Sequence, residues 1–233
     1  MTDKWLHLCE LSGDPWVLPI WASVHRAMAA GRTTAITPEL SEMGVHISTR
    51  LTLLPRVVDR LTKDVSALYC TAKAYEPEHV FTRTKSGTAL PVDNDIKYHV
   101  IADVDSFLFE VNACAELMQK FFQLLYAHAG KPITDKEDVA KAVIAVLKKD
   151  GVPKAWFKKL KQARNFAAHN GTPYVAIDIS EYGKWEALFL KENIVLLDDK
   201  RKFFKVSDLQ DISHGFSSAK TALQKHLVEL FQL

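Results

Sequence analysis

The sequence predicts a mostly helical, all-α fold, and two long apolar patterns carry that prediction. Apolar residues recur at alternating steps of four and three from Leu40 to Tyr75 and again from Ile101 to Leu125, as they do on one face of an α-helix. Of the 233 residues, 48% are hydrophobic and 25% are charged, which fits a packed chain and excludes a disordered or collagen-like one. This length allows one or two domains.

The first long helix is expected to begin at Pro38, because Thr37 is a typical N-cap residue and proline is favoured at the first helical position. Pro55 lies within the run and removes a backbone donor, so it predicts a kink near Leu51. Two helices that meet at this point are the alternative. After this helix, residues 76–95 predict an irregular connection with room for a short hairpin.

The second long helix is expected to be apolar on two sides. Besides its main stripe it carries a partial second face, formed by Phe107, Cys114, Phe121 and Leu124. Such a helix either lies at the centre of a bundle or packs against a partner chain as well as its own core.

The C-terminal half contains signals for three further helices and a hairpin. Capping boxes are expected at two helix starts, formed by Thr134 with Glu137 and by Ser207 with Gln210. Two strand-like runs, 193–197 and 202–206, predict a surface hairpin before the last helix. The helix between the boxes that ends at Asn170 has an apolar stripe of Trp156, Leu160, Ala163 and Ala167.

No repeat, low-complexity tract or flexible linker divides the sequence. We expect residues 1–94 to form an N-terminal helical segment that packs on a helical domain of residues 95–233, in one compact unit. Three cysteines at unpaired spacings favour a reducing compartment. The first residues do not read as a secretory signal, and no stretch approaches the roughly 18 apolar residues of a membrane span. The expected location is the cytoplasm, without membrane contact.

Common signatures of enzymes and metal sites are absent from the sequence, including the phosphate-binding loop, the nucleophile elbow, His-Glu-x-x-His and Cys-x-x-Cys. Glu76 and His79 have the Glu-x-x-His spacing of di-iron bundles, but Pro77 lies between them in a predicted loop. We therefore expect no metal and no cofactor. Residues expected to be surface or hydrogen-bonded interior histidines are His128, His214 and His226.

One segment, from Ala155 to Gly171, combines residues that suit chemistry at a phosphodiester. Because the formal net charge is only +2, any contact with nucleic acid needs such a local patch. Arg164 and His169 are five residues apart, about 140° around a helix, so one helix cannot bring them face to face. His169 lies in the last turn, where the helix end favours an imidazolium. The preceding surface is made basic by Lys158, Lys159 and Lys161.

The run Arg164-Asn165-Phe166-Ala167-Ala168-His169 resembles the Arg-x(4–6)-His signature of the HEPN superfamily, including the polar residue that often follows the arginine. The resemblance covers residues 95–233 and implies a HEPN-like up-and-down helical bundle. It also implies a metal-independent endoribonuclease of a prokaryotic toxin or defence system, acting as a homodimer in which two motifs meet across a two-fold axis. An antitoxin or other regulatory protein then joins RNA among the candidate partners.

The resemblance implies a role for each site residue. His169 acts as general acid or base when an RNA 2′-hydroxyl attacks the adjacent phosphate, and Arg164 neutralises charge on the phosphoryl oxygens. Asn165 orients the site or bonds the phosphate, while Lys158 and Lys161 bind RNA. One alternative is a non-catalytic HEPN-like domain that binds RNA, a nucleotide or a partner protein. In a purely structural motif, Arg164 pairs with a carboxylate and His169 interacts with the helix dipole.

Overall fold

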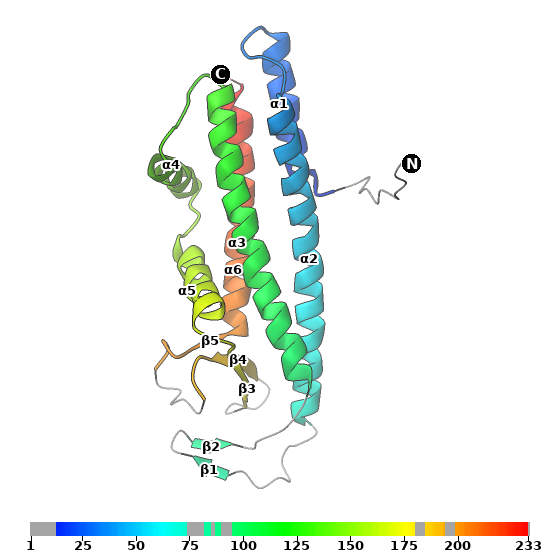
Figure 1. Ribbon diagram of the computed structural model, residues 1–233, viewed down its shortest axis with the longest axis vertical. Helices are drawn as coiled ribbons and strands as arrows, with labels where there is room; N and C mark the ends of the chain where they lie inside the picture. The colour runs from blue at the N-terminus through cyan, green and yellow to red at the C-terminus, as the bar shows by residue number, and fades with distance from the viewer. Residues whose placement is uncertain are drawn as a thin grey trace, which may run out of the picture. The chain divides into compact units, whose positions relative to one another are not determined.

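The computed structural model of the protein describes residues 13–73, 82–84, 87–89, 95–179, 185–193 and 199–232. Within these residues the chain is mostly helical, at 73% with six helices, and a small antiparallel sheet of three strands precedes the last helix (Figure 1). The prediction of a mostly helical fold is confirmed.

The secondary structure elements follow one another as two long helices, two short ones and a final long helix, after a short N-terminal helix. The helices are α1 (Leu18–Ala29), α2 (Pro38–Lys73), α3 (Ile96–His128), α4 (Lys136–Lys149), α5 (Ala155–His169) and α6 (Val206–Leu230). The strands are β1 (Thr82–Thr84), β2 (Gly87–Ala89), β3 (Tyr174–Asp178), β4 (Glu186–Leu190) and β5 (Phe203–Lys205).

Helix α2 is continuous through Pro55, so the single-helix prediction is confirmed and the two-helix alternative is wrong. The hydroxyl of Thr37 accepts the N–H of Leu40 at 3.3 Å and caps the helix start, as expected. Pro55 is exposed. Because proline has no N–H, one backbone carbonyl of α2 lacks its helical donor, and water can hydrogen-bond that carbonyl at the surface. After α2, β1 and β2 pair in antiparallel fashion, which confirms the predicted short hairpin. Residues 76–81, 85–86 and 90–94 of the predicted irregular connection lie outside the described residues.

The chain forms two compact units that each combine distant parts of the sequence. Unit 1 comprises Met1–Leu53, Ala113–Asp150 and Lys220–Leu233, and unit 2 comprises Leu54–Asn112 and Gly151–Ala219. Both units therefore take residues from each side of the 94/95 boundary. The division into residues 1–94 and 95–233 stays a prediction.

In unit 1 an N-terminal element that the sequence patterns did not predict anchors to α6. Asp14 caps a single 3-10 turn by accepting the N–H of Trp16, and its carboxylate pairs with Lys220 at 3.1 Å. The indole N–H of Trp16 donates to the Lys220 carbonyl at 2.8 Å. The rings of Trp16 and Trp21 both contact Phe121 of α3, with centroids 5.9 and 5.3 Å away. Asp14 followed by proline was the available helix-start signal.

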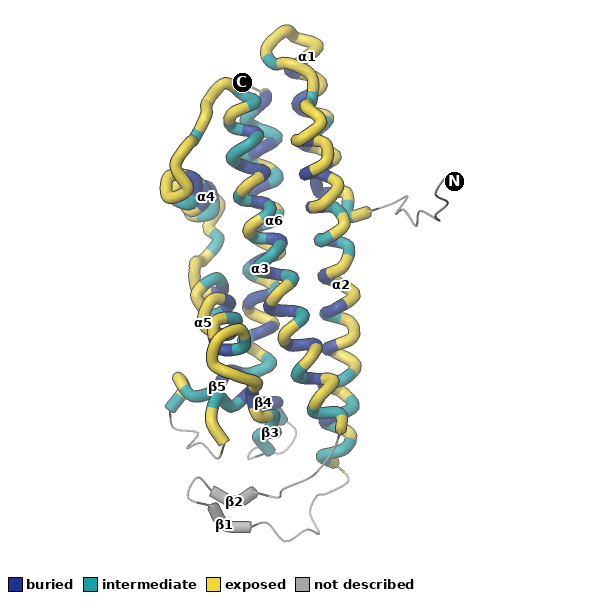
Figure 2. The backbone as a smooth tube through the Cα atoms, in the orientation of Figure 1, coloured by how far each residue is buried: buried dark blue, intermediate teal, exposed yellow. Residues whose placement is uncertain are grey.

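Both apolar sides of α3 are buried within the chain (Figure 2). Phe107, Cys114 and Phe121 of the second face are as inaccessible as Val104 and Leu108 of the main stripe. Leu124, the fourth residue of that face, is half-buried. The chain itself therefore covers most of the second face, and packing of this helix against a partner chain stays a prediction.

In unit 2 the three-stranded sheet has β4 at its centre, in the order β3-β4-β5, and all pairs are antiparallel. Ala187, Leu188 and Phe189 of β4 are fully buried, and Phe189 stacks on Phe204 of β5 at 5.0 Å. The N–H of Ala187 donates to the hydroxyl of Tyr69 at 2.9 Å, which ties the sheet to α2.

The predicted surface hairpin is wrong in two respects. The run 202–206 does contain β5, but the described partner of β5 is β4, which begins at Glu186. Residues 194–197 of the other predicted strand lie outside the described residues, and Asn193 lies in a bend. The central strand, β4, is also buried instead of lying at the surface. A buried strand carries consecutive apolar residues, so β4 lacks the alternation of polar and apolar residues that indicates an exposed strand.

At both predicted capping boxes, the hydrogen bonds in the structure differ from those expected. The cap of α4 is Asp135 instead of Thr134, since the Asp135 carboxylate accepts the N–H groups of Glu137 and Asp138. The Ser207 hydroxyl donates to the Glu186 carboxylate of β4 and caps no N–H of its own helix in the described structure. The choice between neighbouring candidates depends on the local backbone and on residues distant in sequence, which a four-residue pattern does not contain.

Helices α5 and α6 approach closely in unit 2, where the Trp156 indole lies over Gly215. A Cβ at position 215 would lie 2.2 Å from Cγ of Trp156, so the contact requires glycine although glycine is unfavourable within a helix. Phe216 adds an edge-on ring contact to Trp156 at 6.2 Å. The orientation of α5 on α6 therefore depends on a glycine that leaves room for an indole.

Gly215→Ala should destabilise the protein, although alanine normally favours a helix interior by about 1 kcal/mol. The rigid, buried indole must shift to make room, and we expect the free energy of unfolding to fall by about 1–3 kcal/mol, the usual cost of overpacking. Denaturant titration measures the change. Ser218→Ala, at an exposed position of the same helix, is the control and should stay within about 0.5 kcal/mol of the parent. A Gly215→Ala variant as stable as the parent would contradict this account.

Candidate nucleic-acid interface

Helix α5 packs through one face and leaves the opposite face in solvent. Trp156, Leu160 and Ala163 of the predicted stripe are buried, while Ala167 is only half-buried. Phe166, which the pattern did not place on the stripe, is buried instead. The Phe166 ring lies 5.9 Å from Nζ of Lys191, the residue that follows β4. A residue outside α5 therefore contributes to the burial of Phe166.

The exposed side of α5 carries most of the predicted site residues. Lys158, Lys161, Asn165 and His169 are all exposed and follow one another at steps of three and four, which places them along one face. We call these four residues the basic face of α5. The helix contains no Asp or Glu, so nothing within α5 neutralises this face.

Arg164 lies at the flank of the basic face and is half-buried. It is separated from His169 by about 7.5 Å of helix rise and 140° of rotation. Among the described residues, no hydrogen bond or ion pair joins Arg164 to His169 or to a carboxylate. The structural alternative in which a described carboxylate pairs with Arg164 is therefore wrong, and within one chain the two motif residues stay apart.

His169 is the last residue of α5, and the chain turns away directly after it. The Asn170 N–H donates to the Phe166 carbonyl at 2.9 Å and closes the helix. Gly171 then adopts φ +134°, a value that favours glycine, and leads through Pro173 into β3. The predicted end of this helix at Asn170-Gly171 is confirmed, and it leaves the His169 imidazole in solvent near the free carbonyls of the last turn.

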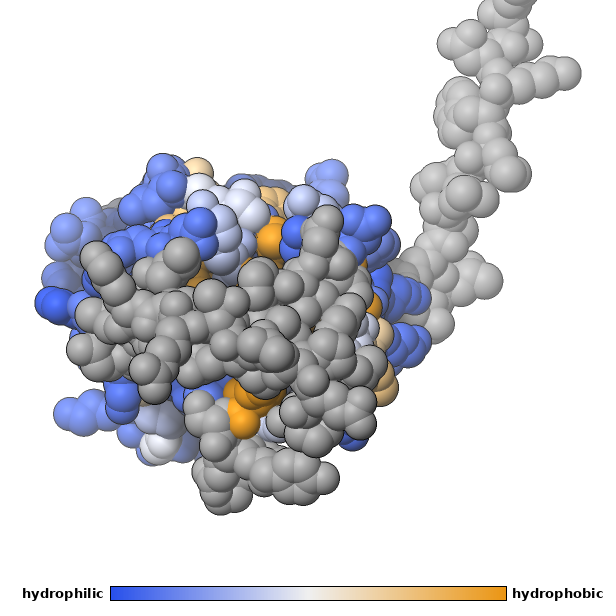
Figure 3. All heavy atoms as spheres, turned by 90° about the horizontal axis from the view of Figure 1, so that it is seen from below, coloured by the Kyte–Doolittle hydropathy of each residue, from blue (hydrophilic) through white to orange (hydrophobic). Residues whose placement is uncertain are grey.

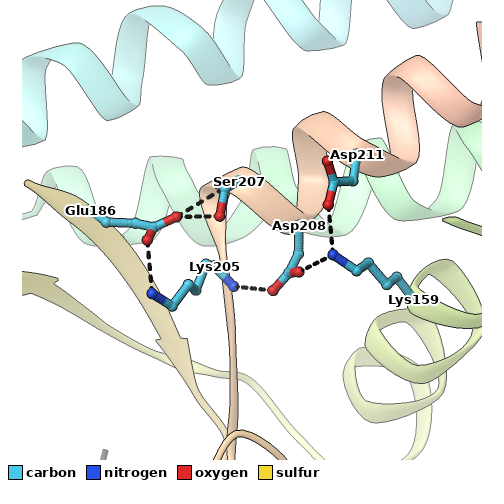
Figure 4. Close-up of polar contacts among 6 residues, drawn as sticks. All are labelled: Lys159, Glu186, Lys205, Ser207, Asp208 and Asp211. Atoms are coloured by element: carbon cyan, nitrogen blue, oxygen red, sulfur yellow. Dashed lines mark hydrogen bonds and ion pairs between the residues drawn. The ribbon is translucent and has the colours of Figure 1, made fainter. Parts of the chain in front are cut away.

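Lys159 has a different environment from its neighbours Lys158 and Lys161. Its Nζ lies 2.6 Å from Oδ1 of Asp208 and 2.6 Å from Oδ2 of Asp211, both in the first turns of α6 (Figure 4). These hydrogen bonds, that to Asp208 foremost, raise the pKa of Lys159. Lys159 therefore joins α5 to α6. By contrast, no described carboxylate pairs with Lys158 or Lys161.

A second set of charges fixes the start of α6 next to the sheet (Figure 4). The Glu186 carboxylate accepts the Ser207 N–H at 3.2 Å and hydroxyl, and it pairs with Nζ of Lys205 at 2.9 Å. Burial acts to raise the pKa of Glu186, but the hydrogen bonds from Ser207 and Lys205 outweigh it and lower the pKa. The Lys205 N–H donates to Asp208 at 3.0 Å, so the two sets of contacts are continuous.

The sheet contributes further exposed residues beside the end of α5. Tyr174 opens β3 and is 50% exposed, and its Cα pairs with that of Leu190 at the end of β4. Lys191 follows directly and donates from Nζ to the Arg201 carbonyl at 2.7 Å. Where side chains are visible at this end of the molecule, hydrophilic ones predominate (Figure 3). The sequence analysis missed these residues because it did not identify β3 or β4.

Together these residues can bind an anion and move a proton. The exposed imidazole of His169 can accept or donate a proton. A guanidinium and two unpaired ammonium groups lie on the same helix. Backbone phosphates of a nucleic acid provide the matching negative charge.

The described residues contain no group of three His, Cys, Asp or Glu side chains arranged to hold a metal ion. Glu76 and His79, whose spacing matches a di-iron pattern but which we did not expect to bind a metal, lie outside the described residues. None of the described helices is long and apolar enough to cross a membrane.

The other predicted histidines differ among themselves. His214 is exposed, and Nε2 of His226 lies 2.7 Å from the Tyr126 hydroxyl, so these two expectations are confirmed. Burial lowers the pKa of His226. His128 is half-buried, and its Nε2 is buried with no hydrogen-bond partner among the described residues, so the expectation of a satisfied interior residue is wrong for that atom.

The chain matches no family model, no curated protein and no solved structure with which it was compared. The likeness to HEPN domains therefore rests on the Arg164–His169 motif and its place in a helical fold.

Replacing Glu186 by glutamine tests the contacts at the start of α6. Because the folded-state pKa of Glu186 is lowered from its ordinary value of 4.5, its ionised form contributes stability above pH 4.5 that is lost as the pH falls through the lowered value. Glu186→Gln should cost about 1 kcal/mol at pH 7, and the difference from the parent should shrink below pH 4.5. Melting temperatures from pH 3 to pH 7 give the comparison.

The matched control is Glu192→Gln, which removes an exposed carboxylate whose ion pair with Lys202 spans 2.8 Å. Exposed pairs contribute little, so this variant should melt close to the parent throughout. A constant difference between Glu186→Gln and the parent at every pH would contradict the assigned role of the Glu186 charge.

Proposed function

We propose that this protein is a HEPN-type, metal-independent endoribonuclease of a prokaryotic toxin or defence system. The observation that carries the proposal is the Arg164–His169 motif on a helix without acidic residues, with His169 exposed at the helix end. The basic face of α5 supplies unpaired positive charge beside it. A cytoplasmic location and an antitoxin or other regulatory partner belong to the same proposal.

The chemistry assigned to His169 is proton transfer. A neutral imidazole takes the proton of an RNA 2′-hydroxyl while the 2′-oxygen bonds to the adjacent phosphorus. The bond from phosphorus to the 5′-oxygen breaks, and that oxygen receives a proton from the imidazolium so formed or from water, so each site needs one His169. The products are a cyclic phosphate end and a 5′-hydroxyl end, and no metal or oxidant enters the balance.

Arg164 stabilises the negative charge that develops on the phosphoryl oxygens, for which its planar, five-donor guanidinium is suited. Asn165 bonds a phosphate oxygen from the neighbouring position on the basic face. Lys158 and Lys161 hold the RNA backbone by charge. Lys159 is excluded from this role because both of its carboxylate partners belong to the protein.

The separation of Arg164 from His169 within one helix supports a two-fold dimer. In a symmetric pair of chains, Arg164 of one chain can face His169 of the other, so that one cleft holds two complete pairs. The alternative is a non-catalytic domain that binds RNA, a nucleotide or a partner protein. It does not require Arg164 of one chain to face His169 of another.

His169→Ala should reduce RNA cleavage at least about a hundredfold, the usual scale of general acid–base catalysis, and Arg164→Ala by a comparable factor. Both residues lie outside the buried stripe, so the variants should melt within a few degrees of the parent. Cleavage of a labelled RNA, with and without chelator, is the measurement, and the chelator should have no effect. Lys161→Ala should weaken binding and flatten its salt dependence while nearly sparing the cleavage rate of bound RNA.

Two separate variants serve as controls, Lys158→Ala and Lys159→Met. The first should change RNA binding only, and the second should lower the melting temperature by removing the partner of Asp208 and Asp211. If pure parent protein leaves RNA uncut, or if the Arg164→Ala/His169→Ala double variant cuts it normally, the ribonuclease assignment fails. RNA binding without cleavage would favour the non-catalytic alternative.

Mixing the two inactive variants tests the dimeric site directly. A dimer of one Arg164→Ala chain and one His169→Ala chain keeps one intact pair, made of Arg164 from the second chain and His169 from the first. Random assembly makes about half of the dimers mixed, so co-expressed chains should recover about a quarter of the parent activity. No recovery, in a sample whose mass is that of a dimer, would show that the residues act within one chain.

A further inference from the structure

We infer that Tyr174 is a base-stacking residue that restricts this ribonuclease to single-stranded RNA. The inference rests on the proposed function, because it names the form of RNA that the Arg164–His169 site accepts. It assigns to Tyr174 a contact with an unpaired nucleobase near the scissile phosphate.

Tyr174 lies close to the candidate site along the chain. Tyr174 lies five positions after His169, so the two Cα atoms can be at most about 18 Å apart. Between them, Gly171 has a positive φ and Pro173 is buried. The residue is thus held near the end of α5.

The ring of Tyr174 is available for a ligand. The side chain is 50% exposed although it is large and mostly apolar, and its hydroxyl has no hydrogen-bond partner among the described residues. Its strand, β3, lies at the edge of the sheet and pairs with β4 alone among the described strands. Half of this large side chain is therefore accessible to a ligand.

A basic residue lies between α5 and the strand that pairs with Tyr174. Leu190, the Cα partner of Tyr174, is followed by Lys191, and Nζ of Lys191 lies 5.9 Å from the ring of Phe166 on α5. Positive charge therefore continues from the basic face of α5 to the start of the sheet. Proteins that bind single strands commonly combine a basic path for phosphates with aromatic rings for bases.

The other strongly exposed tyrosine of unit 2 lacks this setting. Tyr98 on α3 is 60% exposed, and Nζ of Lys97 lies 4.9 Å from its ring. However, the same helix carries the exposed carboxylate of Asp105, whose charge opposes RNA. Tyr98 is therefore a matched control for a tyrosine whose ring is exposed but has no role in binding.

Stacking on Tyr174 requires an unpaired base, because the bases of a duplex are already stacked on one another and their faces are covered. A single strand can place one base on the ring while its phosphates follow the basic face. A rigid duplex gains only the phosphate contacts. The site should therefore prefer single strands, and this preference should depend on the ring of Tyr174.

The test measures binding in full-length His169→Ala protein, so that RNA is not cleaved during the experiment. The probes are a labelled unstructured 12-nucleotide RNA and a labelled duplex of the same length, followed by fluorescence anisotropy. Removing a stacking ring should weaken single-strand binding about 5- to 140-fold in the added Tyr174→Ala variant, the range measured for base–aromatic stacking. Duplex binding should change less than twofold, and Tyr174→Phe and Tyr98→Ala should bind the single strand like His169→Ala alone.

A second readout uses 2-aminopurine in the single strand, whose fluorescence falls when the base stacks. The quenching should be lost with Tyr174→Ala and kept with Tyr174→Phe. Equal single-strand binding with and without Tyr174, or equal loss for single strand and duplex, would overturn the inference while leaving the ribonuclease proposal intact. Tyr174-dependent binding by a parent protein that cuts no RNA would keep the stacking assignment and overturn the nuclease.

Discussion

The approach of α5 to α6 at Trp156 and Gly215 is the constraint on which the candidate site depends. A side chain as small as alanine at position 215 would displace the indole, and with it the helix that carries Arg164 and His169. Packed interiors have little spare volume, so the angle at which α5 leaves α6 is set by this contact. The ion pairs of Lys159 with Asp208 and Asp211 then hold the same two helices from the solvent side.

The lysines of α5 fall into two groups, according to whether a carboxylate of the described structure pairs with the ammonium group. Lys159 faces carboxylates from the start of α6, where a helix end also favours negative charge. Lys158 and Lys161 lie on the basic face, where no described carboxylate pairs with them and Nζ of Lys161 lies 4.9 Å from the ring of Phe157. Lys159 therefore has a structural role, and the lysines proposed to bind RNA lie one and two positions away from it along the helix.

The sequence predicted the long helices and the end of α5 because both depend on local signals: a repeated apolar stripe, and Asn170-Gly171 where the helix stops. It did not predict β4, whose buried Phe189 has apolar neighbours instead of alternating polar ones. Nor could it separate Lys159 from its neighbours, since the deciding carboxylates are about 50 residues away in sequence. Features set by distant partners have no signature in a short window, whereas the residues of the basic face lie within one helix and follow from its local pattern.

The late position of Gly215 in the chain has a consequence for synthesis on the ribosome. Trp156 emerges about 60 residues before the glycine that receives it, and domains fold only once their parts are available. Throughout that interval α5 has neither its packing partner nor the carboxylates that hold Lys159. The nascent chain thus carries the complete Arg164–His169 motif without the framework that orients it, and the motif acquires its fixed position only after Gly215 and the start of α6 have emerged.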